Sequence, residues 1–464
     1  MSDTLMISVS GMRGHVGTDL TPELVARHAA ALGAWVRTSA ASQVAAAGRP
    51  RPAVVLGRDA RTSGAMFTHA AMAGLMSVGV DVIDVGVVPT PTVQLAVEHH
   101  RAGAGLILTA SHNPIEWNAL KFVGPDGIFL DGDAGARVRA LAEEGPPRMG
   151  WDGIGTVQED RDAVARHLDA VMALPMIDVA AIRARGFHVA LDCVRGAGAS
   201  AIPPLLERLG CRMSGINLEP DGRFPRAPEP VPENLGDLGR LVRDSGADLG
   251  LAVDPDVDRL ALVDEHGEPI GEDYTLAFAV RAVLDERINP AERPTVVVNL
   301  STSLVVEDAA RKAGARVVRA PVGEANVARA IRDERAVIGG EGNGGVMLPA
   351  LHIGRDAPLG VALILHLLAT SGVTVSELVA SSPRYTIVKA KGPRGPELRP
   401  LYDRLRSKFQ EAEADERDGL RLSWPDRWLH VRPSGTEPIV RLIAEAPTAA
   451  GAELLVATAR ELLQ

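Results

Sequence analysis

The sequence contains little cysteine and few aromatic residues. Its 464 residues include two cysteines, Cys193 and Cys211, which are too few for a disulfide framework, so a reducing cytoplasm is the expected compartment. Aromatic residues make up 3% of the chain, and the core must therefore rest on Ala, Val, Leu and Ile. The length exceeds what one hydrophobic core holds, so roughly three or four domains are expected.

The chain also lacks an excess of basic residues and any long apolar run. Its formal net charge of −10 at pH 7 argues against nucleic acid as the main partner, although local arginines can still hold a phosphorylated small molecule. No uncharged apolar run reaches the ~18 residues that a membrane span needs, and residues 1–10 do not resemble a secretory signal. The sequence predicts a cytoplasmic protein with neither membrane nor nucleic acid as partner.

A strand–helix–strand pattern recurs along most of the chain. Apolar strands begin at Val54, Val189 and Val296, and the helical stretch after each of them ends at a glycine: Gly79, Gly210 and Gly314. Units of this kind build α/β layers, so three related α/β domains are expected. From residue 373 the strand-like and helical segments are segregated, which favours a small C-terminal α+β domain.

A polar loop, residues 109–114, directly follows the apolar strand AGLILTA. This is where α/β folds place ligands, and the loop offers the Ser111 hydroxyl and the His112 imidazole, with Lys121 ten residues further on. A solvated turn with an ordinary surface serine is the alternative. A hydrolase triad fits less well, because no G-x-S-x-G motif is present.

Three carboxylates, Asp254, Asp256 and Asp258, alternate in a loop between two apolar strands. Such a cluster is costly without a cation, and oxygen ligands indicate Mg²⁺ or Ca²⁺. The spacing resembles a calcium-binding EF-hand loop, but Arg259 stands where that loop needs glycine, and strands flank it instead of helices. Arg259 suits a phosphoryl oxygen better than calcium storage.

Two later loops offer groups for a sugar and a phosphate. Residues 340–345 surround Glu341 and Asn343 with glycines, and this acceptor and amide suit vicinal sugar hydroxyls, although a flexible turn is the alternative. Residues 432–438 form a candidate anion cradle, or else an ordinary turn. Its contributors would be Arg432, Ser434 and Thr436, joined by Arg441.

Together the four loops predict phosphoryl transfer on a phosphorylated sugar in one central cleft. They lie one to a predicted domain: 1–150 with the serine loop, 151–256 with the metal loop at its end, 257–372 with the sugar-reading loop and 373–464 with the phosphate-binding loop. Links rich in proline and glycine at 142–152 and 391–400 are candidate boundaries.

The same motifs resemble the α-D-phosphohexomutase superfamily over essentially the whole length. The similar segments are SVSGMRGHVGTDLTPE, TASHNPIEWNALKF, DPDVDR, GEGNGG and RPSGTEP, in the family order. The resemblance implies an α/β protein with four domains around a central cleft, in which three similar α/β domains with mixed sheets precede a smaller C-terminal α+β domain.

The resemblance also implies a role for each motif. Ser111 would be the phosphoserine, and its phosphate would join Asp254, Asp256 and Asp258 in holding one Mg²⁺. The group in transfer would be surrounded by Arg13, His112, Lys121 and Arg259, with Lys121 as candidate general acid or base. Glu341 and Asn343 would read the 3- and 4-hydroxyls of the sugar. The phosphate that does not react would be held by Arg432, Ser434, Gly435 and Thr436.

The implied reaction interconverts hexose 6-phosphate and hexose 1-phosphate through a hexose 1,6-bisphosphate. GEGNGG and the upstream PEPVPENL resemble the phosphoglucosamine mutase branch more than the dual phosphomannomutase/phosphoglucomutase branch, whose loop reads GEMSGH. Glucosamine 6-phosphate is therefore the expected substrate, with mannose or glucose phosphate as the alternative. Glu324 in VGEAN stands where relatives often carry aspartate or histidine, so no role is assigned to it.

Two other classes of function remain open at this stage. A sugar-phosphate phosphatase would use the same metal and phosphate loops, and a non-catalytic sugar-phosphate sensor would need only the binding loops. The intact Ser111, Lys121 and three-aspartate set speaks against a sensor. The sequence is compatible with a monomer or a homodimer.

Overall fold

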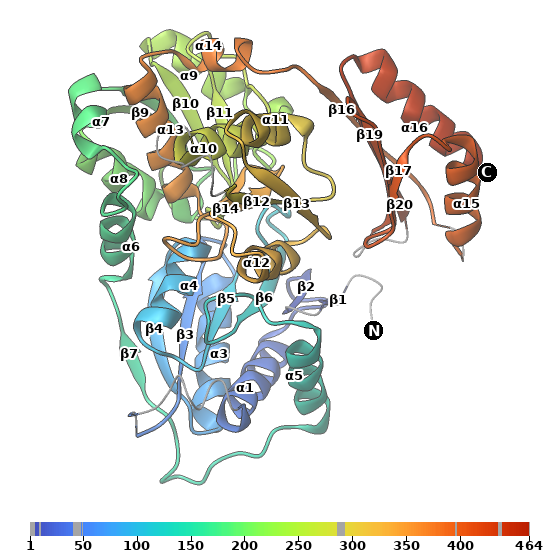
Figure 1. Cartoon of the computed structure of the whole chain (residues 1–464). Coiled ribbons are helices and arrows are strands. Elements are labelled where there is room, and N and C mark those ends of the chain that lie inside the picture. The colour runs from blue at the N-terminus through green and yellow to red at the C-terminus, as the bar shows by residue number, and fades with distance from the viewer. Residues whose placement is uncertain are drawn as a thin grey trace.

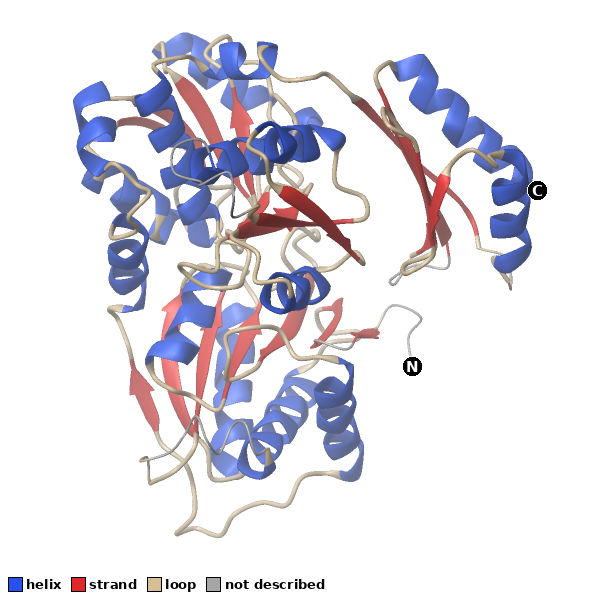
Figure 2. Ribbon diagram, viewed as in Figure 1, coloured by secondary structure: helices blue, strands red, loops and turns tan. Residues whose placement is uncertain are grey.

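The computed structural model describes residues 5–8, 11–39, 48, 50–284, 293–394, 397–434 and 439–463. Four sheets follow one another along the chain, and helices pack on each of them (Figures 1 and 2). The predicted fold class is confirmed: three α/β domains with mixed sheets precede a domain with an antiparallel sheet. No helix among these residues is both long and apolar enough to cross a membrane.

The first domain contains a seven-stranded sheet in the order β1-β2-β6-β5-β3-β4-β7. Its parallel strands β3, β4 and β5 are followed by the antiparallel pair β5 and β6. The strands are β1 (Met6–Ser8), β2 (Gly11–His15), β3 (Ala53–Arg58), β4 (Asp81–Val87), β5 (Ala104–Leu108), β6 (Trp117–Val123) and β7 (Val157–Glu159). The helices are α1 (Pro22–Thr38), α3 (Gly64–Ser77), α4 (Thr90–His99) and α5 (Gly132–Glu144).

The second domain contains a four-stranded sheet in the order β11-β10-β8-β9. Its strands are β8 (His188–Asp192), β9 (Arg212–Ile216), β10 (Leu249–Val253) and β11 (Leu260–Val263). Its helices are α6 (Ala163–Met172), α7 (Val179–Arg185), α8 (Ile202–Arg208) and α9 (Gly236–Ser245), with short 3₁₀ turns η1 (Ala197–Ser200) and η2 (Pro232–Asn234).

The third domain repeats this arrangement in the order β13-β12-β14-β15. Its strands are β12 (Thr295–Asn299), β13 (Arg316–Ala320), β14 (Ile338–Glu341) and β15 (Gly345–Met347). Its helices are α10 (Glu272–Leu284), α11 (Leu304–Lys312), α12 (Glu324–Asp333), α13 (Ala357–Ser371) and α14 (Val375–Ala380). One continuous cluster of buried apolar side chains spans the second and third domains, so these two domains share a core.

The fourth domain is a five-stranded antiparallel sheet in the order β16-β20-β19-β18-β17, with its own buried core. Its strands are β16 (Thr386–Pro393), β17 (Glu413–Asp415), β18 (Leu420–Ser423), β19 (Trp428–Pro433) and β20 (Ile439–Ala446). Helices α15 (Arg399–Lys408) and α16 (Ala449–Leu463) pack on it (Figure 1).

The three α/β domains place their functional loops at one topological position. In each, a strand that pairs in parallel within the sheet ends and the chain turns into an antiparallel neighbour: β5 into β6, β10 into β11, and β14 into β15. These turns carry the serine, metal and sugar-reading loops, respectively. The carboxyl end of a parallel strand is the usual ligand position in α/β sheets. The repeated topology therefore puts each of the three loops at a position suited to ligand binding.

The first and second sheets each include one strand that lies beyond the predicted domain boundary, at residue 150 and at residue 256. Strand β7 pairs with β4 of the first sheet, and β11 pairs with β10 across the metal loop.

Candidate active site

A cavity of about 1200 Å³ is lined by residues from all four domains. It brings together the serine loop, Arg259 of the metal loop, the sugar-reading loop and the two arginines of the fourth domain. The predicted residues on its wall are Arg13, Ser111, His112, Lys121, Arg259, Glu341, Asn343, Arg432 and Arg441. Gly435 and Thr436 lie outside the residues that the structure describes.

The Ser111 hydroxyl faces the metal loop. Its Oγ donates to Asp254 Oδ2 at 2.8 Å, although the two residues come from different domains. The Ser111 backbone is left-handed (φ 48°), a conformation that costs a non-glycine residue about 1–3 kcal/mol, so the surrounding structure must hold it. Part of that support is local, because the Ser111 N–H donates to Thr109 Oγ1 at 2.9 Å.

Arg61 supplies the rest of that support, and sequence reasoning missed it. Its side chain is buried and ion-paired with Asp59, 3.0 Å away. Its two terminal nitrogens donate to four carbonyl oxygens of the serine loop and the strand after it, those of Ser111, Asn113, Pro114 and Trp117, at 2.6–2.9 Å. All five guanidinium N–H groups are therefore used, and they bind the serine loop to the loop that follows β3.

The metal loop is a tight turn that concentrates three buried carboxylates. Val257 adopts a left-handed backbone (φ 62°), which is strained for a β-branched residue. The three aspartates each place an oxygen within 4.8 Å of the others. Within the described part of the chain, Oδ1 of Asp256 and Oδ1 of Asp258 are buried and have no hydrogen-bond donor. Two orphaned carboxylate oxygens beside a third carboxylate fit a hard divalent cation.

The charges around this turn are uneven. Burial, with the nearby Asp258 and Asp256, raises the pKa of Asp254 well above its usual range. Burial alone would raise the pKa of Asp256, but the Lys121 ammonium, 2.7 Å from Asp256 Oδ2, lowers it. Burial likewise opposes the charge on Lys121, yet the pairing with Asp256 leaves the pKa of Lys121 raised. Lys121 is therefore positively charged in the site.

Arginines from three domains face the cavity. Burial and the positive charges of Arg259 and Arg441 lower the pKa of Arg13, which shows that these guanidiniums lie near one another. The charge of Arg259, and then burial, lowers the pKa of His112 to about 2, so His112 is neutral at pH 7. Arg259 donates to Glu229 Oε1 at 2.9 Å. Clustered guanidiniums of this kind suit a phosphate group.

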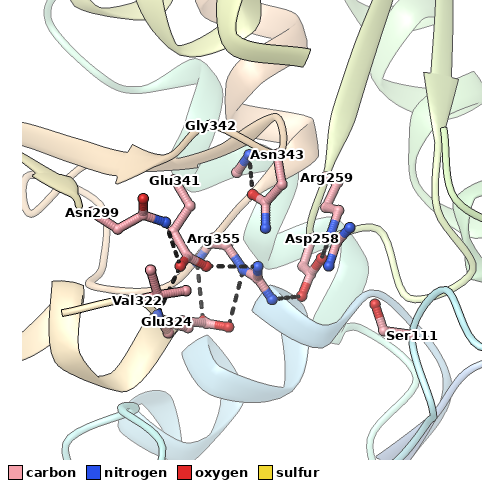
Figure 3. A network of polar contacts seen from close by, with 12 residues as sticks. Ser111, Asp258, Arg259, Asn299, Val322, Glu324, Glu341, Gly342, Asn343 and Arg355 are labelled. Carbon is pink, nitrogen blue, oxygen red and sulfur yellow. Dashed lines mark hydrogen bonds and ion pairs between the residues drawn. The ribbon is translucent and has the colours of Figure 1, made fainter. Parts of the chain in front are cut away.

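In the sugar-reading loop, hydrogen bonds hold both carboxylate oxygens of Glu341 (Figure 3). Its Oε1 accepts from Asn299 Nδ2 at 2.9 Å and from the Gly323 N–H at 3.0 Å, and its Oε2 accepts from Arg355 Nη1 at 2.9 Å. Burial would raise the pKa of Glu341, but the charge of Arg355 and the hydrogen bonds from Asn299 and Gly323 together lower it. Asn343 lies on the same wall of the cavity.

Glu324 and Arg355 belong to the same network. The sequence alone assigned no role to Glu324 and did not identify Arg355. Arg355 Nε donates to Glu324 Oε2 at 3.1 Å, and both side chains line the cavity. No local motif marks either residue, because their partners lie far away in the sequence.

The fourth domain contributes the remaining positive charge. Arg432 and Arg441 are directly opposite each other on β19 and β20. Arg432 Nε forms an ion pair with Asp418 Oδ2 at 3.0 Å, and the same oxygen accepts from the Val322 N–H of the third domain, also at 3.0 Å. Two like charges on neighbouring strands repel each other, so the pair favours an anion in the cavity.

Known protein families match the chain along nearly its whole length. Its four segments match the four domains described as phosphoglucomutase/phosphomannomutase: alpha/beta/alpha domain I over residues 5–148, domain II over 165–267, domain III over 271–385 and the C-terminal domain over 389–462.

Individual proteins similar to this chain carry names from the same family. The chain is 38% identical over 441 residues to a probable phosphoglucosamine mutase of Methanopyrus kandleri, covering 94% of this chain and 93% of the relative. It is also 38% identical over 440 residues to a phosphoglucomutase/phosphomannomutase of Thermococcus kodakarensis, with the same coverage. A solved phosphoglucomutase/phosphomannomutase family protein from Burkholderia thailandensis is 26% identical, with a TM-score of 0.84 over 99% of this chain and 98% of that one.

Proposed function

The chain belongs to the phosphoglucomutase/phosphomannomutase family and is a mutase, and from that premise we propose that Ser111 is its phosphoryl carrier. The observation that carries this proposal is the 2.8 Å contact between Asp254 and the Oγ of Ser111, which lies on the wall of a cavity shared by four domains. A hydroxyl beside a carboxylate cluster that calls for a cation is a suitable phosphoryl acceptor and donor.

The proposed reaction has two transfers. Phosphoserine 111 gives its phosphoryl group to the free hydroxyl of a hexose 6-phosphate, which forms a hexose 1,6-bisphosphate and leaves the Ser111 hydroxyl. After the intermediate turns over in the cavity, Ser111 attacks the other phosphate, and hexose 1-phosphate leaves. The proton lost by the attacking hydroxyl in each step returns to the oxygen that is released, so the cycle is balanced.

The residues divide this work by their charges. Asp254, Asp256 and Asp258, with a phosphate oxygen on Ser111, would hold Mg²⁺, which supplies positive charge next to the transferring group. Lys121, which pairs with Asp256, would be the candidate general acid or base for the hydroxyl that attacks or leaves.

The other polar groups bind the sugar phosphate. Arg13, Arg259 and the neutral His112 would surround the transferring group. Glu341 and Asn343 would take the 3- and 4-hydroxyls of the sugar, while the unreactive phosphate would lie against Arg432 and Arg441. The sequence motif adds Ser434, Gly435 and Thr436 as proposed contributors to this phosphate site.

We propose glucosamine 6-phosphate as the substrate, with mannose and glucose phosphates as the alternative. GEGNGG and PEPVPENL support glucosamine, whereas the two relatives at 38% identity carry different substrate names and do not decide between them. The position that distinguishes these sugars is carbon 2, which Glu341 and Asn343 are not proposed to read.

A coupled assay with Mg²⁺ and a trace of hexose 1,6-bisphosphate tests the proposal. Wild type and Ser111→Ala are compared on glucosamine 6-phosphate, glucose 1-phosphate and mannose 1-phosphate. We expect the highest kcat/KM for glucosamine 6-phosphate and no activity in Ser111→Ala. A better glucose or mannose substrate would overturn the sugar assignment alone. Full activity in Ser111→Ala would overturn the carrier, and steady release of inorganic phosphate would indicate a phosphatase.

A further inference from the structure

Arg355 has no part in the proposed function, yet it contacts two of the loops that carry it. We infer that Arg355 is a positioning residue that joins the metal loop to the sugar-reading loop, so that the cation and the sugar are bound in one fixed arrangement. The inference rests on the proposed function for the roles of Asp258 and Glu341.

The guanidinium of Arg355 lies between three carboxylates (Figure 3). Its Nη2 donates to Asp258 Oδ2 at 2.5 Å, its Nη1 to Glu341 Oε2 at 2.9 Å, and its Nε to Glu324 Oε2 at 3.1 Å. The side chain of Arg355 is 9% exposed, and the side chains of Asp258, Glu341 and Glu324 are 0%, 4% and 7% exposed. Each guanidinium nitrogen thus serves a different buried carboxylate.

These contacts determine how the two functional carboxylates face the cavity. Arg355 occupies Oδ2 of Asp258, and Oδ1 of the same carboxylate is an oxygen for which the described residues offer no hydrogen-bond donor. Holding one oxygen fixes the direction of the other, which is how groups outside a metal's own ligands orient those ligands. Glu341 is held in the same way through Oε2.

A lysine cannot reproduce this arrangement. The guanidinium is planar and its donors on three separate nitrogens point in fixed directions, whereas an ammonium is one compact charge on a flexible stem and does not hold its acceptors in fixed directions. Removal of Arg355 would also leave three buried carboxylates close together without their shared cation. Mutual repulsion would then turn Asp258 and Glu341 away from their present directions.

The backbone of Arg355 is itself anchored where domains meet. Its N–H donates to Glu324 Oε1 at 3.3 Å. The next residue, Asp356, caps α13 and is hydrogen-bonded through Oδ2 to His167 at 2.7 Å and to His352 at 3.0 Å, all of them buried. His167 is bonded in turn to Thr92 of the first domain at 2.8 Å. These buried hydrogen bonds hold the backbone at Arg355 in place.

The experiment measures metal and sugar binding separately. Mn²⁺, which prefers the same oxygen ligands, is titrated into substrate-free Arg355→Lys and wild type, and free Mn²⁺ is followed by electron paramagnetic resonance. We expect Mn²⁺ affinity to fall about 10–100-fold in the variant. In steady-state assays at saturating Mg²⁺, we expect KM for the sugar phosphate to rise about tenfold or more, because Glu341 is no longer oriented.

Two further variants separate positioning from general damage. Arg208→Lys makes the same change at an ion pair with Asp169, neither of which lines the cavity, and both constants should stay at the wild-type values. Glu324→Gln weakens the third anchor of Arg355 without removing a contact to Asp258 or Glu341, and it should lower Mn²⁺ affinity and raise KM by a smaller factor. Glu324→Gln also serves if Arg355→Lys does not fold.

Double-mutant cycles supply the decisive readout. If Arg355 acts through Asp258 and Glu341, adding Arg355→Lys to Asp258→Asn should cost little further Mn²⁺ affinity, and adding it to Glu341→Gln should cost little further KM. Multiplicative losses in both cycles, or wild-type constants in a folded Arg355→Lys, would overturn the inference. Wild type that binds no Mn²⁺ would overturn it together with the metal site. Wild type that binds Mn²⁺ but has no mutase activity would overturn the proposed function.

Discussion

Arg61 Nη2 donates to the carbonyl oxygen of Ser111 at 2.7 Å, across 50 positions of sequence. This contact and its companions hold the left-handed backbone that turns the Ser111 hydroxyl toward the metal loop. The conformation of the proposed phosphoryl carrier therefore depends on a residue of another loop.

Replacement of Arg61 by glutamine should damage both stability and activity. The substitution leaves Asp59 buried without its cation and several carbonyl oxygens without donors, so we expect a loss of about 3–5 kcal/mol in the free energy of unfolding. Urea denaturation measures this loss, and kcat should fall in the protein that remains folded. The control Arg161→Gln breaks an exposed pair with Glu159 and should cost less than about 1 kcal/mol. Equal losses in the two variants would contradict the prediction.

Mg²⁺ should stabilise the wild-type chain but not Asp254→Asn. Burial, and then the nearby Asp258 and Asp256, raise the pKa of Asp254, so a negative charge at this position is unfavourable in the metal-free chain and its removal should stabilise that chain. We expect metal-free Asp254→Asn to unfold at or above the wild-type temperature in calorimetry with EDTA. Addition of Mg²⁺ should raise Tm for wild type only. A Tm shift of the same size in the variant would refute the assignment of Asp254 as a ligand.

Asp273 should make stability fall as pH rises. Burial is the main cause that raises the pKa of Asp273 to about 8, whereas an unfolded aspartate titrates near 3.9. Between these values the folded chain binds one more proton than the unfolded chain. The stability due to this group is therefore complete below about pH 4 and is lost as pH rises to 8, at about 1.4 kcal/mol per pH unit.

Asp273→Asn should flatten that dependence. The amide oxygen can still accept from the Ser303 N–H, which lies 2.8 Å from Asp273 Oδ1, so the fold keeps this contact. Urea denaturation at several pH values between 5 and 9 compares the two proteins. We expect the variant to be the more stable protein at pH 9. Parallel curves for the two proteins would show that Asp273 does not titrate in this range.

Glu341→Gln should weaken sugar binding without preventing transfer to Ser111. The amide loses the ion pair with Arg355 and one acceptor oxygen, so we expect KM for the sugar phosphate to rise about 10–100-fold, as for a charged hydrogen bond. Labelling of Ser111 by a ³²P-hexose bisphosphate at saturating concentration should remain. Asn343→Ser, which restores the serine of the GEMSGH loop, should have a smaller effect on KM. Loss of labelling in Glu341→Gln would instead place Glu341 in the transfer itself.

Much of the fold followed from local pattern. Strands that begin near Val54, Val189 and Val296, each followed by a helix that ends near a glycine, predicted three α/β domains, and the structure confirms them. Nothing in the sequence indicated that β7 and β11, which lie beyond the predicted boundaries at residues 150 and 256, pair with strands that precede those boundaries. Pairing across such a distance leaves no mark on the composition of the link.

The candidate site divides in the same way. The sequence by itself determined which chemical groups are available, because Ser111, the three aspartates and Glu341 each stand in a short motif at the end of a strand, where backbone geometry and residue type act together. Only the tertiary structure decided how those groups are oriented. Arg61 lies 50 positions from Ser111, and Arg355 lies 97 positions from Asp258, so each acts through space on a loop that its own neighbours in sequence do not reveal.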